Sequence, residues 1–183
     1  HYPHIQTILE QHQSIDERVG ITPTLLAADV AGKRLLQVPV GQLTRDYDDV
    51  RRIFDAARHT AQLILDSGIR KPLLEVNLAG LTANQAAQFE NAIEAAYLGL
   101  CQGLWQPLEA RQALDEDVIE PIHCVGLIES KGNVDVQRLN ALEAGKRLAR
   151  DLCGTEPERM APPGFADYCV DAFKGSNVSV NVI

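Results

Sequence analysis

The feature that most constrains the fold is an alternation of helical segments with short apolar runs. Apolar residues recur at helical spacing in three segments, 46–68, 82–100 and 134–152. Short apolar runs, typical of strands, lie between them at 73–78 and 118–128. This alternation predicts an α/β fold in which a largely parallel sheet is flanked by helices.

A hairpin near the start makes the predicted sheet mixed. Two strands are expected at 24–29 and 34–40, around the turn Ala31-Gly32-Lys33. Asp46 or Thr44 is the expected cap of the first helix after this hairpin, and Gly68 is expected at C′, just past its C-terminal end. Thr82 is the expected cap of the next helix.

The third helix and the residues after it suggest a division of the chain. Val136, Leu139 and Leu142 share one face of this helix, so Leu142 is expected to be buried and Leu142→Ala to cost roughly 2–5 kcal/mol. Three prolines follow as a linker, then a short helix, then an alternating apolar strand at 178–183, where the sheet of a second, truncated domain is expected to begin. The expected units are an N-terminal α/β domain (1–132), a linker helix (133–154) and the start of a C-terminal domain (155–183).

Composition excludes several classes of function. The chain of 183 residues has a formal net charge of -8, which disfavours binding to nucleic acid or to an anionic membrane surface. Its apolar stretches fall short of the ~20 residues that a membrane-spanning helix needs. The cysteines form no CxxC pair, so reduced and buried structural thiols in a cytoplasmic protein are expected at positions 101, 124, 153 and 169.

Each candidate site has a structural interpretation that fits it better. Asp46, Asp48 and Asp49 resemble calcium ligands, but they also suit the positive start of a helix. The acidic run of Asp115, Glu116, Asp117 and Glu120 is interpreted as a solvated loop. The segment Gly41-Gln42-Leu43-Thr44 lacks the glycine spacing of a phosphate loop.

The histidines and aromatic residues also give no site. His123 and Cys124 are neighbours on an expected strand and would point to opposite faces, which argues against a catalytic pair. His59 is expected on an exposed helix face, and the terminal histidines at 1, 4 and 12 could bind a metal only weakly. Trp105 and Tyr97 are expected in the core. The sequence therefore assigns no catalytic, cofactor-binding or metal-binding residue.

Three segments resemble the cytosolic leucine aminopeptidase family. The run Ala149-Arg150-Asp151-Leu152, followed by Pro157 and Pro162, resembles the junction between that family's linker helix and its catalytic domain. Val38-Pro39-Val40-Gly41 and Glu94-Ala95-Ala96-Tyr97-Leu98-Gly99 are similar to parts of the N-terminal domain. Cys153-Gly154-Thr155 stands where the family commonly has residues rich in Val and Asn, which indicates a divergent member.

The resemblance implies a macrodomain-like N-terminal domain joined to a C-terminal catalytic domain, usually in a homo-hexamer. The family removes N-terminal residues from peptides with two divalent metals, Zn or Mn, which activate water and stabilise the oxyanion. Those metals and the peptide substrate would be bound by the C-terminal catalytic domain, whose metal motif does not occur in these 183 residues.

Three hypotheses remain open. The chain is a non-catalytic N-terminal region that positions and assembles a peptidase domain, or a macrodomain-like ligand-binding module, or a peptidase-derived scaffold without activity. Glycine-rich phosphate loops would favour the second. The presence or absence of metal ligands after Ile183 would separate the first from the third.

Overall fold

The computed structural model describes residues 4–79, 81–128 and 134–183. It combines helices with short strands in the order α1 (Ile5–Gln13), β1 (Thr24–Ala27), the 3-10 turn η1 (Ala31–Lys33), β2 (Arg34–Gln37), α2 (Val50–Asp66), β3 (Leu73–Glu75), α3 (Ala83–Gln88), α4 (Ala92–Leu104), α5 (Leu108–Ala113), α6 (Glu116–Ile119), β4 (Gly126–Ile128), α7 (Val136–Gly154) and α8 (Pro162–Ala172). None of the described helices is both long enough and apolar enough to cross a lipid bilayer.

The strands form two small sheets. β1 and β2 pair antiparallel, with Thr24 opposite Gln37, which confirms the predicted hairpin. β3 and β4 pair parallel, with Leu73 opposite Gly126. In the described part of the chain these pairs are not joined into the one mixed sheet that the sequence predicted. The macrodomain-like topology stays a prediction.

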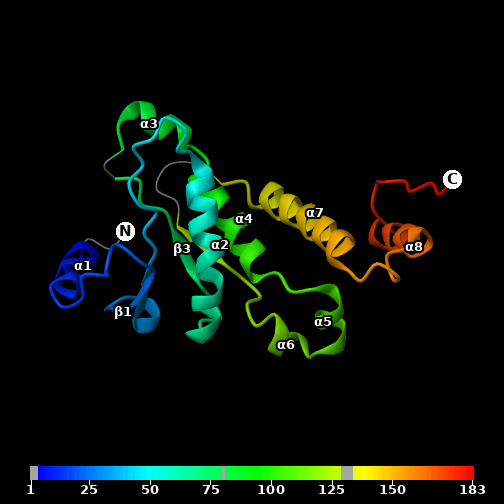
Figure 1. Cartoon of the computed structure of the whole chain (residues 1–183), viewed down its shortest axis with the longest axis horizontal. Helices are drawn as coiled ribbons and strands as arrows, with labels where there is room; N and C mark the ends of the chain where they lie inside the picture. The colour runs from blue at the N-terminus through cyan, green and yellow to red at the C-terminus, as the bar shows by residue number, and fades with distance from the viewer. Residues whose placement is uncertain (1–3, 80, 129–133) are drawn as a thin grey trace.

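The core lies between α2 and α4, which run side by side at the centre of the molecule (Figure 1). One cluster joins Ile53 of α2 to Phe89, Ala92 and Ala96. The second cluster contains Ala61, Ile64 and Leu100. Ile53, Ala61 and Ile64 lie at helical spacing on α2, and Ala92, Ala96 and Leu100 do so on α4.

The helix ends test the capping residues predicted from the sequence. Gly68 adopts a φ of 66°, a left-handed conformation that suits glycine, and its N–H bonds the carbonyl of Leu65. Thr82 forms a capping box with Gln85, as its position predicts. The predicted cap of α2 is wrong, because Asp49 rather than Asp46 or Thr44 accepts the bond from the Arg51 N–H, at 2.9 Å.

Three predicted elements need correction. The helix expected at 82–100 is divided into α3 and α4 by non-helical backbone at Phe89 and Asn91. The strand expected at 118–128 shrinks to β4, because Asp115 caps the short helix α6 in its place. The run 73–78 gives only the short strand β3, and Leu73 is 54% exposed rather than buried.

The packing face of α7 differs from its prediction. Leu139 is buried, but Val136 and Leu142 on the same predicted face are 55% and 46% exposed. Residues 178–183 have no strand partner among the described residues, so the strand expected there, in the sheet of a second domain, stays a prediction. The expected boundary between the first unit and the linker helix falls at 132–133, outside the described residues, and the division into three units stays a prediction.

Candidate functional site: the polar junction at the end of helix α7

A single buried carboxylate joins four parts of the molecule. Asp151, in the last turns of α7, is only 4% exposed. Its Oδ1 accepts a hydrogen bond from the indole Nε1 of Trp105 at 2.8 Å and forms an ion pair with Arg111 of α5. Its Oδ2 accepts from the Tyr168 hydroxyl of α8 at 3.3 Å. The carboxylate therefore links the end of α4, α5, α7 and α8.

The partners of Asp151 offset the cost of burying its charge. Burial alone would raise the pKa of this carboxyl, but the hydrogen bonds from Arg111 and Trp105 outweigh it and hold the pKa below its ordinary value. Burial raises the pKa of Tyr168, and the negative charge of Asp151 adds to that rise. Asp151 is thus an ionised acceptor, and Tyr168 is a neutral donor to it.

Further bonds orient the groups around this carboxylate. Arg111 also donates from Nε to the Gln106 carbonyl at 3.0 Å, which anchors the guanidinium at both ends. The buried Thr155 donates its hydroxyl to the Asp151 carbonyl at 2.7 Å, so the last turn of α7 is closed around residue 151.

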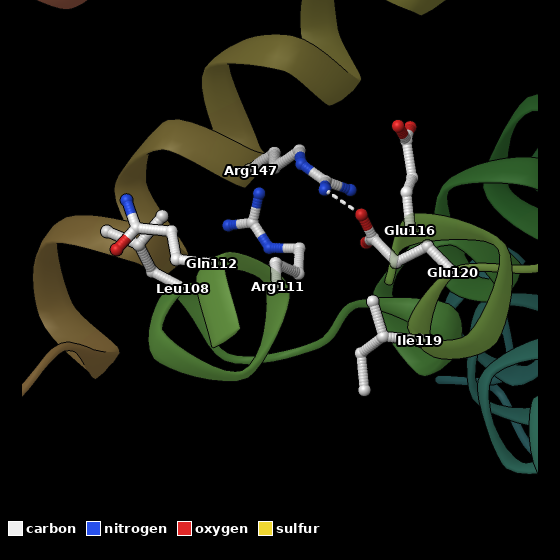
Figure 2. Close-up of a pocket in the computed structure, with 7 residues that line it drawn as sticks. All are labelled: Leu108, Arg111, Gln112, Glu116, Ile119, Glu120 and Arg147. Carbon is white, nitrogen blue, oxygen red and sulfur yellow. Dashed lines mark hydrogen bonds and ion pairs between the residues drawn. The ribbon is translucent and has the colours of Figure 1, made fainter. Parts of the chain in front are cut away.

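A hollow of about 260 Å³ lies beside this junction, between α5, α6 and α7 (Figure 2). Arg111 and Arg147 lie next to each other there, and each is paired with a carboxylate, Asp151 and Glu120 respectively. The seven side chains that line it include no nucleophile: Leu108, Arg111, Gln112, Glu116, Ile119, Glu120 and Arg147. Each of these ion pairs joins a residue of α7 to the α5–α6 segment, and neither arginine is left with an unpaired charge.

A second hollow of about 320 Å³ contains the cysteine and histidine residues singled out in the sequence. Burial and the charge of Glu143 raise the pKa of the Cys101 thiol to about 11, so it stays protonated and is a poor nucleophile. The ring of His123 bonds Asp117 at 3.1 Å, and Cys124 is exposed. The hydrogen bond of the His123 ring therefore goes to a carboxylate rather than to the neighbouring thiol.

The four cysteines are free thiols, and none of them is fully buried. Cys124 and Cys153 are exposed, which corrects the prediction of four buried thiols. Trp105 and Tyr97, expected in the core, are half-buried and use their polar atoms. The Tyr97 hydroxyl donates to Asn140 of α7 at 3.0 Å.

The other candidate positions have structural roles. Asp115 caps α6, and Glu120 pairs with Arg147, so the acidic run is more ordered than a solvated loop. His59 is exposed, as expected, and His4 bonds the Asp29 carbonyl. His1 lies outside the described residues. In the described part of the chain, no group of three or more His, Cys, Asp or Glu residues could hold a metal ion.

The loop before α2 is organised by a second buried carboxylate. Asp48 is 3% exposed, and it accepts bonds from the Arg45 guanidinium at 2.7 and 3.0 Å. Arg52 also lies 3.8 Å from this carboxylate. The Arg45 guanidinium, followed by its backbone N–H, holds the pKa of Asp48 below its ordinary value. This loop is therefore fixed by internal ion pairs, which explains Asp48 without a calcium ion.

The lowered pKa of Asp48 predicts a specific acid sensitivity. The stability that its ionised form contributes is complete above the unfolded pKa, near pH 4, and is lost as the pH falls through the folded value. Asp48→Asn is therefore expected to flatten the fall of the urea midpoint below about pH 4. Asp46→Asn, at an exposed neighbour, is the control and should retain the wild-type pH profile. Parallel profiles for wild type and Asp48→Asn would contradict the prediction.

Sequence reasoning missed the Asp151 junction. Asp151 belongs to the Ala149–Leu152 motif, but nothing in the sequence marks it as buried or paired. The available signal is an acidic residue beside apolar residues on a long helix, in a chain with one tryptophan that needs a hydrogen-bond acceptor.

Comparison with known proteins identifies a relative. Over 155 residues, or 84% of the chain, the sequence is 32% identical to a Caenorhabditis elegans protein named "Putative aminopeptidase". The chain spans 28% of the length of that relative. No protein-family model matches the chain, and no solved structure matches it. The chain is thus related, over most of its length, to about a quarter of a protein that carries an aminopeptidase name.

Proposed function

We propose that this chain is the N-terminal, non-catalytic region of a leucine-type metallo-aminopeptidase, and that it positions and assembles the catalytic domain. The single observation that carries the proposal is the 32% identity, over 84% of the chain, to the protein with the aminopeptidase name. Because the matched part is 28% of that relative, most of a comparable parent protein would lie outside these residues.

The attachment of α7 supports a positioning role. Arg138 lies 3.4 Å from Glu94 of α4, and Tyr97 of α4 donates to Asn140. Farther along, Lys146 lies 5.1 Å from the centre of the Phe54 ring of α2. Helix α7 therefore contacts the central pair α2–α4 at several points, and Asp151 binds neighbouring elements at its C-terminal end. Its orientation fixes the position from which the following residues continue.

The metals and the oligomer belong to the proposal only through the family resemblance. Two divalent metals, Zn or Mn, are assigned to the parent's catalytic domain by that resemblance alone. The parent is proposed to be a homo-oligomer, a hexamer by resemblance, that acts on the N-terminus of peptides. No step of that chemistry is assigned to a residue of this chain.

Activity separates this proposal from the peptidase-derived scaffold. The purified 183-residue chain is expected to release no detectable p-nitroaniline from Leu-p-nitroanilide with Mn²⁺ or Zn²⁺ added. The complete parent protein should release it in the presence of the metal and lose that activity with a chelator. Metal-dependent turnover by the chain alone would overturn the non-catalytic assignment. A parent that binds metal weakly and stays inactive would favour the peptidase-derived scaffold.

A further inference from the structure

We propose that Asp151 is a positioning residue: its carboxylate fixes helix α8 to the N-terminal body, and so sets the direction in which the chain continues after Pro162. We call the contacts of Asp151 with Trp105, Arg111 and Tyr168 the clamp. Its role rests on the proposed function, in which the segment after Pro162 leads into the catalytic domain. Its geometry depends only on the contacts of Trp105, Arg111 and Tyr168 with Asp151.

Apolar burial holds α8 only weakly. The helix has no fully buried residue, and its Phe165 and Val170 are 44% and 43% exposed. In Figure 1, α8 lies beyond the C-terminal end of α7, away from the central pair α2–α4. A helix with so little buried surface gains little orientation from packing, so individual polar contacts decide where it lies.

The contact between Tyr168 and Asp151 has the properties that such a role needs. Its acceptor is charged and nearly inaccessible to water, and the separation of 3.3 Å is long for an O–H···O hydrogen bond. Just before α8, the Glu156 N–H donates to Glu109 of α5 at 3.0 Å, a second tie to the same helix that carries Arg111. α8 is thus connected to the α5–α7 corner rather than to α7 alone.

The Asp151 carboxylate is oriented by residues outside α8. Trp105 and Arg111 both bind Oδ1, which leaves Oδ2 directed at Tyr168. Arg147 and Arg159 add positive charge around the pair, and Glu109 adds negative charge. An asparagine at 151 would lose the charge that Arg111 needs and would replace one of the two acceptor oxygens by a donor. Both sides of the clamp therefore depend on a carboxylate at this position.

The orientation of α8 can be measured directly in the 183-residue chain. Residual dipolar couplings of the backbone N–H groups at 166–172 report whether α8 is fixed relative to α2, α4 and α7. In the wild type all four helices should fit one alignment tensor. In Tyr168→Phe the couplings of α8 should shrink severalfold toward zero, while those of the other three helices stay unchanged.

The single tryptophan reports on its own bond to Asp151 independently of the Tyr168 bond. Trp105 gives one indole N–H resonance, whose position reports its hydrogen bond to Asp151. Tyr168→Phe should leave this resonance in place, whereas Asp151→Asn should shift it and release α8 as well. Asp167→Asn is the matched control, since it makes the same chemical change at an exposed position of α8 and should alter neither readout.

The outcomes are distinct. If α8 keeps its full couplings in Tyr168→Phe, the clamp is wrong, and this holds even if Asp151→Asn fails to fold. If Asp167→Asn loosens α8 as much as Tyr168→Phe does, general helix destabilisation explains the result and the clamp is again wrong. Neither measurement requires peptidase activity, so an inactive parent would refute the proposed function while leaving the clamp standing.

Discussion

Gly99→Ala is expected to destabilise the chain strongly, although alanine is the better helix former. Gly99 and Gly103 lie four residues apart on the face of α4 that meets α2. A Cβ at Gly99 would overlap the Phe54 carbonyl, 2.9 Å from its carbon, and one at Gly103 would lie 2.6 Å from the Ala61 Cβ. The group in the way at Gly99 is backbone, which cannot swing aside, so the cost should reach the upper end of about 1–3 kcal/mol or exceed it. The urea midpoint measures it.

Gly145→Ala is the matched control for this substitution. Gly145 is also inside a helix, but a Cβ there meets nothing within 4 Å. The same change should therefore stabilise the chain by about 0.5–1 kcal/mol, which is the difference in helix propensity. If Gly99→Ala and Gly145→Ala moved the urea midpoint in the same direction, the close approach of α2 and α4 would be wrong.

Local signals explain most of the elements that could be predicted from the sequence. The turn at Gly32, the end of α2 at Gly68 and the cap at Thr82 each depend on residues within a few positions of one another. The β-branched residues at 118–128 favour a strand, but the side chain of Asp115 caps a short helix at the start of this run, and only 126–128 are extended, in β4. A strand at 178–183 needs a partner, and alternation alone does not supply one.

The candidate site depends on contacts that no local pattern encodes. Asp151 meets Trp105 and Arg111 across 46 and 40 positions of sequence. The chain has 25 acidic residues, and periodicity does not tell which of them will be buried. The family resemblance pointed to the segment around Asp151 but gave it no role. Only the packing of α5 and α8 against the end of α7 shows that this carboxylate is shared.

The packing face of α7 can be tested by one substitution made at two positions. Leu139→Ala is expected to cost about 2–5 kcal/mol, because Leu139 is 2% exposed and its loss would leave a cavity beside α4. Leu142→Ala should cost less, about 1 kcal/mol or below, since that residue is 46% exposed and about half of it remains in water. Helical spacing alone placed both residues on one buried face, yet α7 touches α4 along a narrower strip. Equal shifts of the urea midpoint for the two variants would show that α7 packs on a broader face than its contacts with α4 indicate. The orientation of α7, and with it the position of α8, would then be wrong.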